Sequence, residues 1–489
     1  MRKTLFVLLA AAILAPIAVA ELQTVEIGGS LRLRGNWFTG EIWAWDSDWG
    51  NTLAVVEQRT RLNFKAQFTD NVSAYVELDS YDVWGEDFRS NWLTGVDGRA
   101  ATNNDVEVYQ AYVEANEMWG YPLRLRVGRQ ELALGSQWLV GVNDSKAWFR
   151  GLSFDGVRVT YAPEDFSIDA IWAKLAENSP FEEDGDIDLY ALYGTYSGIE
   201  NISLDAYWIL VRDARGIVPD TPNIVPGLGW ALQVWEDWFG LDEWDPTTLH
   251  TFGLRGAGKL LDDRLDFEAE VAYQIGEADQ VGKLFRYWYS DNEADYDNWG
   301  ANLEVGYTFD TTWTPRVYLG GAWLDGEDNR TPDTFGEWIY SLLCPVSRPD
   351  ASMGFNRLFS NWEYSEFIDN TTLSNVWLIR GGVSAMPTEK IKVLLAVTYY
   401  ESIDELQTLR WLRFPWDPQS IDSTLGWETG LYATYNYSED LTFEAGWAHL
   451  FVDDGLADGN FVVGNGLANW RGTDTDDADY LYVETKICF

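Results

Sequence analysis

Charged side chains recur at every second position in several extended segments of the sequence. The basic set comprises Arg32, Arg34, Arg59, Arg61, Lys65, Arg124, Arg126 and Arg158. The acidic set comprises Asp205, Asp266, Glu268, Glu270, Glu304, Glu428 and Glu444. Residues spaced by two project from the same face of a β-strand. Charged rows on the inner wall of a channel select solutes by charge, and this is the chemistry that these residues could perform.

The segment from residue 57 to residue 68 shows how such a strand is built. Its odd positions hold Glu57, Arg59, Arg61, Asn63, Lys65 and Gln67. Its even positions from Thr60 onward hold Thr60, Leu62, Phe64, Ala66 and Phe68. A period of two with one charged and one apolar face predicts a strand whose two sides meet different surroundings. The segments 265–274 and 441–448 repeat the pattern.

About eighteen segments with this alternation are predicted to be strands. They lie near residues 25–38, 53–69, 72–84, 105–118, 121–132, 152–162, 165–176, 186–197, 200–212, 247–258, 264–276, 299–309, 314–325, 373–386, 390–402, 424–437, 440–453 and 479–489. The alternation is weakest in the 105–118 segment. An even number of amphipathic strands in this range predicts an all-β fold, a transmembrane antiparallel β-barrel wide enough for a water-filled channel.

Short and long connections alternate between these segments. Eight are tight and rich in turn residues: 69–71, 119–120, 163–164, 197–200, 261–263, 310–312, 387–389 and 438–439. Nine are longer, and these include 213–246, 277–298, 326–372, 403–423 and 454–478. Short periplasmic turns that alternate with long extracellular loops are typical of outer-membrane barrels. Both termini are therefore predicted to lie on the periplasmic side.

Both ends of the chain carry features of an exported barrel protein. Residues 1–20 combine a basic start, an apolar stretch and an A-x-A site at 18–20, which is the pattern of a cleaved signal peptide. The apolar run is shorter than a membrane-spanning helix. The outer-membrane β-barrel is therefore predicted to occupy residues 21–489. Its last strand is amphipathic and ends on Phe489, which resembles the sorting signal of outer-membrane barrels.

The composition limits the classes of partner and activity. Lys and Arg number 34 against 78 Asp and Glu, and a net charge of −44 argues against nucleic acid as a partner. Aromatic residues reach 15%, which predicts aromatic girdles at the two membrane interfaces. His250 and His449 are the only histidines, and there is no G-x-S-x-G motif or His/Cys metal cluster. No enzyme activity is expected.

Two neighbouring strands carry motifs that resemble a known family. Residues 126–132 contain R-x-G-R-Q-E-L, and residues 154–158 read F-D-G-V-R. The motif positions are Gly128, Arg129, Gln130, Glu131, Phe154, Asp155 and Gly156. The pair is similar to the alginate-export family of outer-membrane proteins, whose relatives include general porins. This resemblance implies a barrel of eighteen strands that is a monomer rather than a trimer.

Two features of the sequence depart from the alginate exporters of that family. Those exporters have a strongly basic pore and a long plugging turn near the C-terminus on the periplasmic side. Here the corresponding turn, Ser438-Glu439, is short. The chain is acidic as a whole, and acidic loops at the mouth would repel an anionic polymer. Small hydrophilic or charged solutes are therefore the expected cargo.

The positions of the charged residues leave two pairs of interpretations open. The basic and acidic sets lie on different sectors of the predicted wall and could form a transverse field that admits polar or zwitterionic solutes. Alternatively, the charges solvate the lumen and pair with each other. Arg129, Glu131 and Asp155 are expected near the outer rim, next to the connection 133–151. They could form a structural hairpin clamp, or that connection could fold inward and constrict the pore.

The long connections contain acidic clusters and one of the two cysteines. The clusters are Asp453, Asp454 and Asp458, and Asp474, Asp476, Asp477 and Asp479. Such clusters could bind Ca²⁺, or Mg²⁺ that bridges lipopolysaccharide. None has the pattern of an EF-hand loop, so a solvated acidic face without a cofactor is expected. Cys344 and Cys488 are predicted on opposite sides of the membrane and therefore unpaired.

These observations predict an outer-membrane channel, or porin, for passive diffusion of small hydrophilic or charged solutes. Its expected partners are outer-membrane lipid, lipopolysaccharide and the barrel assembly machinery. One alternative is a dedicated exporter of a secreted polysaccharide. Another is a structural or surface-interaction barrel whose lumen is plugged by folded-in loops.

Overall fold

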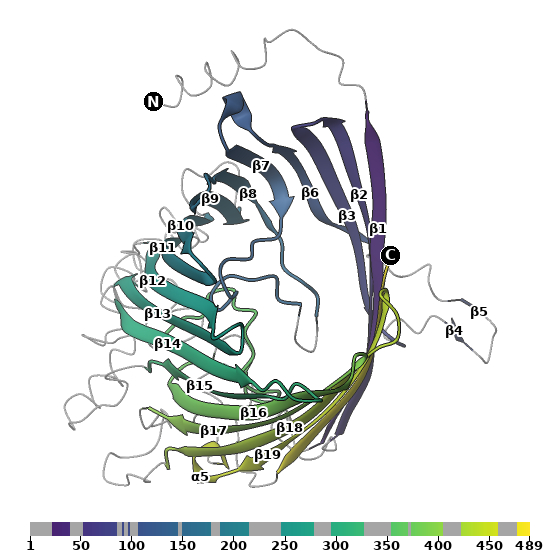
Figure 1. Cartoon of the computed structure of the whole chain (residues 1–489), viewed down its shortest axis with the longest axis vertical. Coiled ribbons are helices and arrows are strands. Elements are labelled where there is room, and N and C mark those ends of the chain that lie inside the picture. Colours follow the sequence, from purple (N-terminus) through teal and green to yellow (C-terminus); the bar gives the residue numbers. More distant parts are fainter. Residues whose placement is uncertain are drawn as a thin grey trace, which may run out of the picture.

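Eighteen antiparallel strands form one closed sheet in the computed structural model (Figure 1). Each strand pairs with its neighbours along the chain, and the last strand, β20 (Ala478–Cys488), pairs with the first, β1 (Thr24–Thr39). The structure describes residues 22–39, 52–85, 90–91, 96–97, 106–144, 149–177, 186–214, 246–277, 295–326, 354–369, 373–403, 422–457 and 477–489. A closed ring has no unpaired edge, which confirms the predicted barrel.

All eighteen predicted strands are present, with ends that differ by a few residues. Between β1 and β20 they are β2 (Thr52–Thr69), β3 (Val72–Val83), β6 (Glu107–Ala115), β7 (Leu123–Gln130), β8 (Phe154–Tyr161), β9 (Phe166–Ala176), β10 (Ile187–Ile199), β11 (Ile202–Asp213), β12 (Thr247–Leu260), β13 (Leu265–Glu277), β14 (Asp295–Thr308), β15 (Arg316–Leu324), β16 (Val376–Thr388), β17 (Ile391–Ser402), β18 (Thr424–Asn436) and β19 (Leu441–Val452). A further pair, β4 (Ser90–Asn91) and β5 (Val96–Asp97), was not predicted and forms a separate two-stranded sheet.

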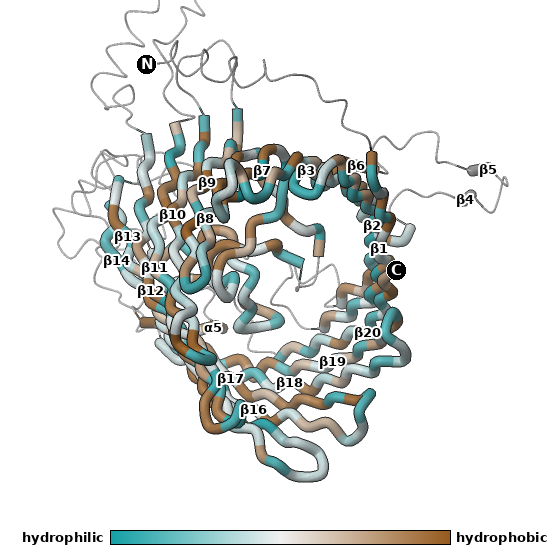
Figure 2. The backbone as a smooth tube through the Cα atoms, turned by 45° about the horizontal axis from the view of Figure 1, so that its top comes forward, coloured by the Kyte–Doolittle hydropathy of each residue, from teal (hydrophilic) through white to brown (hydrophobic). Residues whose placement is uncertain are grey.

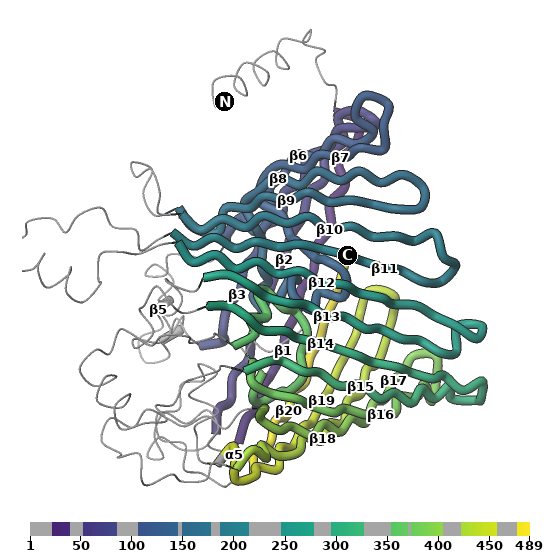
Figure 3. Tube along the Cα trace, turned by 90° about the vertical axis from the view of Figure 1, so that its left-hand side faces the viewer, coloured from purple at the N-terminus to yellow at the C-terminus, as the bar shows by residue number. Residues whose placement is uncertain are grey.

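The tight connections all lie at one end of the barrel, here called the turn end (Figure 3). Several contain non-glycine residues with positive φ, such as Asn201 between β10 and β11 and Asp262 between β12 and β13. A short 3₁₀ helix, η4 (Met118–Gly120), links β6 to β7. The strand ends that border the long connections lie at the other end (Figure 3). The structure therefore confirms the predicted alternation, and among the described residues no helix is long and apolar enough to cross a membrane.

The two faces of each strand differ as the alternation predicted. On β13, Val271, Tyr273 and Ile275 are exposed on the outer surface, whereas Glu270 and Gln274 between them are buried. Figure 2 shows this mixture of hydrophilic and hydrophobic positions along the strands. An outward apolar band and a polar interior are what a membrane barrel requires.

Two segments of the chain lie inside the ring of strands (Figures 1 and 2). Segment A comprises residues 131–144 and 149–152, between β7 and β8, and segment B covers residues 354–369, which precede β16. Buried apolar side chains of both segments pack together and against the wall, for example Trp138 of segment A stacked on Phe355 of segment B. The main apolar core of the protein is therefore inside the barrel.

The last residue takes part in closing the barrel. The Phe489 N–H donates to the Gly29 carbonyl (3.0 Å), and the Gly29 N–H donates to the Phe489 carbonyl (2.9 Å). A Cβ atom at Gly29 would lie 2.7 Å from the Phe489 ring, so only glycine allows this close approach. The neighbouring Cys488 is exposed and unpaired, whereas Cys344 lies outside the described residues.

Candidate channel constriction

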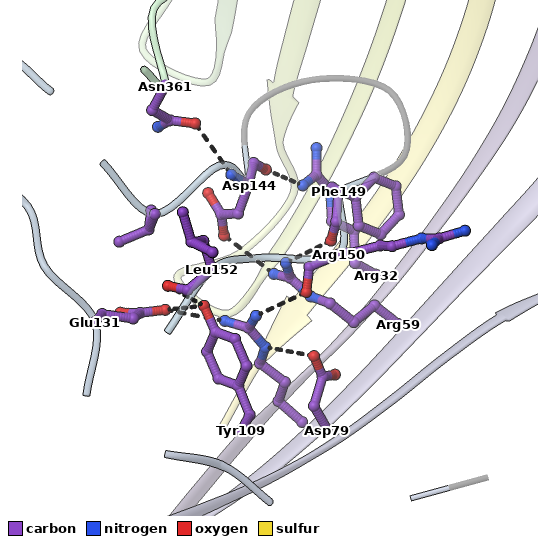
Figure 4. A network of polar contacts seen from close by, with 12 residues as sticks. Arg32, Arg59, Asp79, Tyr109, Glu131, Asp144, Phe149, Arg150, Leu152 and Asn361 are labelled. Carbon is purple, nitrogen blue, oxygen red and sulfur yellow. Dashed lines mark hydrogen bonds and ion pairs between the residues drawn. The ribbon is translucent and has the colours of Figure 1, made fainter. Parts of the chain in front are cut away.

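Segment A is attached to the wall of β1 and β2 by arginine side chains (Figure 4). Arg59 of β2 donates to the Phe149 carbonyl (2.9 Å) and to the Asp144 carboxylate (3.1 Å). Arg32 of β1 donates to the Asp144 carbonyl and stacks over the Phe149 ring at 3.9 Å. Arg59 is only 3% exposed, and a buried guanidinium is stable only when its donors are satisfied. Segment A therefore supplies acceptors to the buried arginines, and the arginines in turn hold segment A against the wall.

A β-bulge adds a tyrosine to this attachment. The register of β3 and β6 pairs Glu77 with Gln110 and Leu78 with Val108, so Tyr109 is the extra residue. The Tyr109 hydroxyl donates to the Glu131 carboxylate (2.7 Å), and its ring stacks on the Arg61 guanidinium (3.7 Å). Bulges often re-aim a side chain in this way. The alternation of strand residues does not predict the inward position of Tyr109, because the bulge interrupts that alternation.

Segment B is attached to β13, β14 and β18 mainly through neutral donors. The Ser365 hydroxyl (2.5 Å) and the Glu366 N–H (3.1 Å) donate to the buried Glu428 carboxylate of β18. The Tyr364 hydroxyl donates to Asn302 of β14 (2.9 Å). A backbone N–H and carbonyl of segment B also pair with the Gln274 amide of β13.

A buried ion pair holds segment B together internally. The Arg357 guanidinium contacts the Asp369 carboxylate at 2.6 Å, and both side chains are 0% exposed. Arg357 also donates to the Ser360 hydroxyl and to the Trp362 carbonyl. These acceptors satisfy both terminal nitrogens of the guanidinium, although its Nε has no partner among the described residues. Additional hydrogen bonds of this kind help a buried pair to be tolerated.

The two segments are joined to each other inside the lumen. Val140 and Phe359 form a parallel β-bridge. The Trp138 indole N–H donates to the Tyr364 hydroxyl (2.8 Å), and the Asp144 N–H donates to the Asn361 side chain (3.0 Å). Segments A and B therefore form one insert, in which segment A contacts β1 and β2 and segment B contacts β13, β14 and β18.

The pKa values of the two carboxyl groups of segment A are shifted in opposite directions. Burial raises the pKa of Glu131, although the hydrogen bond from Tyr109 and the charge of Arg61 oppose this. Burial also acts to raise the pKa of Asp144, but the charge and hydrogen bond of Arg59, helped by Arg32, outweigh it and lower that pKa. Glu131 therefore protonates at a higher pH than Asp144.

The predicted basic residues lie on the inward face of the early strands, and most are paired with carboxylates. Arg32 and Arg34 contact Glu484 of β20 (2.8 and 3.6 Å), and Arg61 contacts Asp79 of β3 (3.3 Å). Arg126 pairs with Glu114, and Arg158 pairs with Asp169. Arg124 donates to Thr160, and Lys65 is exposed.

The predicted acidic residues lie on the inward face of the later strands, and arginines that were not predicted neutralise several of them. Arg255 contacts Asp205 (2.7 Å) and Glu268 (2.9 Å). Arg316 contacts Asp266 and Glu304. Glu270 accepts hydrogen bonds from Tyr207 and Ser136, and Glu428 holds segment B, while Glu444 is half-buried. Local pairing is thus extensive, and a role of these residues in solute selection stays a prediction.

The three charged motif residues at the outer rim separate. Arg129 and Asp155 form a two-fold hydrogen-bonded pair (2.8 Å each) that is exposed on the outer surface. Glu131 instead turns inward to Arg61 and Tyr109. Of the predicted clamp, only the Arg129–Asp155 pair forms. The described part of the 133–151 connection folds inward (Figure 1), and constriction of the pore stays a prediction. Gly128 has φ +128°, and a Cβ there would lie 2.2 Å from the Ala111 carbonyl.

The other motif residues support the root of segment A. Gln130 is 1% exposed and donates to the carbonyls of Gly128 and Gly156. The Phe154 ring packs edge-on against Phe359 of segment B. The motif therefore marks the point where the chain leaves the wall and enters the lumen.

The acidic clusters are described in part. The Asp477 carboxylate accepts from the Val452 N–H, and Asp479 accepts from Trp447 and contacts His449. Asp458, Asp474, Asp476 and the loop residue Trp148 lie outside the described residues. Among the residues that the structure describes, no group of three or more His, Cys, Asp or Glu is arranged to hold a metal ion.

A family model described as alginate export matches residues 25–455. The chain belongs to the alginate export family. The match covers sixteen of the eighteen strands in full and all but the first residue of β1, together with segments A and B. This family member has the fold of an outer-membrane β-barrel. No curated protein sequence matches it.

Three solved structures illustrate the similarity of this fold to known barrels. OccK8 (OprE) of Pseudomonas aeruginosa is 13% identical, with a TM-score of 0.50 over 95% of this chain and 98% of that chain. OprD of the same organism is 12% identical, with a TM-score of 0.51 over 96% and 97%. OccAB3 of Acinetobacter baumannii is 12% identical, with a TM-score of 0.52 over 95% and 100%. At these identities the similarity shows the fold alone.

Proposed function

We propose that this member of the alginate export family is an outer-membrane channel for passive diffusion of small hydrophilic or charged solutes. The observation that carries the proposal is the closed ring of eighteen strands with polar and charged inward faces, narrowed by an insert that is itself polar where it meets the wall. Barrels of this strand number enclose an aqueous lumen. No energy source is required, because diffusion follows the solute gradient.

Single-channel recording in planar bilayers tests the proposal. We expect stepwise conductance in KCl. Neutral solutes that are small enough to enter the lumen should lower this conductance, and larger solutes should not. A correctly folded protein that gives no conductance steps would overturn the proposal. That result would favour the plugged structural barrel, for which segments A and B would be the plug.

A second candidate function is export of a secreted polysaccharide, and the family match over residues 25–455 favours it. An exporter should be blocked by one polymer at concentrations where shorter oligomers have no effect. Block by alginate in particular would favour export over general diffusion. The short 437–440 connection and the net charge of −44 favour diffusion of small solutes.

We further infer how the chain is processed and oriented. Residues 1–20 are a cleaved leader, and residues 21–489 form the barrel. The turn end faces the periplasm, and this supports periplasmic termini, because β1 begins and β20 ends there. Phe489 then serves as the sorting mark for the barrel assembly machinery. The barrel is a monomer that contacts lipid and lipopolysaccharide and uses no cofactor; protease protection of each terminus in intact cells tests the orientation.

A further inference from the structure

A cavity of about 520 Å³ lies toward the turn end, between segment B and the wall of β11 to β14. Its lining includes Asn201, Lys259, Asp266, Glu268, Glu304 and Trp362. Ligand pockets in proteins commonly have volumes of this order and combine an aromatic or apolar surface with a few polar groups. The attachment of segments A and B to the wall does not explain this group of side chains.

Two carboxylates are held side by side at this cavity with acceptor atoms to spare. Glu268 of β13 and Glu304 of β14 are directly opposite in the strand register, an arrangement that costs free energy for like charges. Arg255 donates to Oε1 of Glu268 (2.9 Å), and Arg316 donates to Oε1 of Glu304 (2.9 Å). The Oε2 atoms of both residues accept no hydrogen bond within the described structure. The arginines fix the orientation of the two carboxylates and leave one oxygen of each for a donor from outside.

Trp362 contributes an aromatic surface to the same cavity. Its carbonyl accepts from Arg357, and its ring is half-buried against the apolar core inside the barrel. The indole N–H donates to no acceptor within the described structure. A tryptophan held in this way offers a flat apolar face and one polar donor.

We propose that this cavity binds a pyranose sugar that carries no carboxylate, as a station on the solute path. Sugar hydroxyls would donate to Oε2 of Glu268 and of Glu304, and the C–H face of the ring would pack on Trp362. Uronates are excluded, because a fourth carboxylate would face Asp266, Glu268 and Glu304. The positive charges nearby are those of Lys259, Arg316 and Arg255, and Arg255 also pairs with Asp205, so they do not offset all the carboxylates. The inference names a solute class for the proposed channel, and therefore rests on that function.

Binding of maltotriose, a glucosamine trimer and trigalacturonate to the refolded full chain tests the proposal. We expect tryptophan fluorescence and channel block to report binding of maltotriose or of the glucosamine trimer, but not of trigalacturonate. Affinity should fall about tenfold in Trp362→Leu and in Glu304→Gln, because each removes a contact worth about 1.4 kcal/mol. Trp119→Leu is the matched control, since Trp119 is 79% exposed in the turn before β7 and should leave binding unchanged.

Several results would overturn the sugar site. They are trigalacturonate binding as tight as maltotriose, absence of binding by both other trimers, and unchanged affinity in both variants. Glu304→Gln keeps the test valid if Trp362→Leu fails to fold, and retention of the folded band on unheated gels checks each variant. KCl conductance is recorded in parallel. Normal conductance without sugar binding contradicts the site alone, whereas absent conductance contradicts the proposed channel.

Discussion

Segments A and B lie in the same lumen, but they are attached to the barrel by different chemistry. Segment A is bound by the arginines of β1 and β2 to carboxylates and carbonyls. Segment B is bound mainly by hydroxyl, amide and backbone donors, and the Arg357–Asp369 ion pair lies within it. Protonation of Glu131 or Asp144 removes the charged contacts of segment A, whereas the contacts of segment B with Asn302 and Gln274 contain no titrating group. The comparison indicates that segment A is the adjustable part of the insert and segment B is its fixed support.

The largest expected effect comes from removing the internal pair of segment B. Arg357→Met leaves the Asp369 carboxylate buried without a counter-charge, which should lower the free energy of unfolding by about 3–5 kcal/mol. Denaturant titration of the refolded protein in lipid measures this loss. Arg264→Met is the control, because Arg264 and Asp310 form an exposed pair, and its effect should stay below about 1 kcal/mol. Equal losses of stability in the two variants would contradict the role of segment B as the fixed support.

The next effect separates the segments functionally. Arg59→Gln removes the charged bond to Asp144, and should release segment A, raise single-channel conductance and cost about 2 kcal/mol. Arg158→Gln is the matched control, because Arg158 pairs with Asp169 between two wall strands and touches neither segment. Conductance unchanged in Arg59→Gln, or raised equally in both variants, would contradict the adjustable role of segment A.

The effect of low pH on stability should have opposite signs for the two carboxyl groups of segment A, Asp144 and Glu131. Asp144→Asn should cost about 2 kcal/mol at neutral pH, because the lowered pKa of Asp144 shows that its ionised form is stabilised by folding. Wild-type and variant stabilities should converge as the pH falls from about 4, the unfolded value for Asp, through that lowered pKa. Glu131 has the opposite sign, since its raised pKa means that folding favours its protonated form. Wild type should therefore gain stability relative to Glu131→Gln as the pH falls.

The smallest expected effect concerns the bulge. Tyr109→Phe removes the hydroxyl that donates to Glu131 and should cost about 1 kcal/mol, measured by the same denaturant titration. Tyr75→Phe offers a comparison, because its hydroxyl also donates to a carboxylate, Glu77, but at 3.3 Å on the wall itself. Proteolysis within segment A should increase only in the Tyr109 variant. An increase in both would show that wall hydrogen bonds in general hold the segment.

The barrel could be predicted from the sequence because each strand repeats one local rule. Side chains alternate between lipid and lumen with a period of two, and even the poorly patterned 105–118 segment forms β6 at Glu107–Ala115. The insert follows no such rule. Arg357 and Asp369, or Trp138 and Tyr364, are linked by contacts across long connections that have no period. One available signal was the density of aromatic residues at 355–367, which is unusual for a loop in solvent.

For the charged residues too, the sequence predicts only part of the arrangement. Their inward direction follows from alternation, but their partners follow from strand register and from bulges. Arg255 and Arg316 were not predicted, although they neutralise the acids on β11, β13 and β14. A sequence shows which face a charge occupies, and only the register shows what lies opposite it.

The contact between Phe489 and Gly29 also affects the order of events during barrel assembly. The first strand cannot meet its second neighbour until the final residues of the chain have been synthesised and exported. A chain that stops early presents two open strand edges, which can recruit other chains and mark the product for degradation. Ring closure thus acts as a test of completeness, and only a full-length polypeptide passes it.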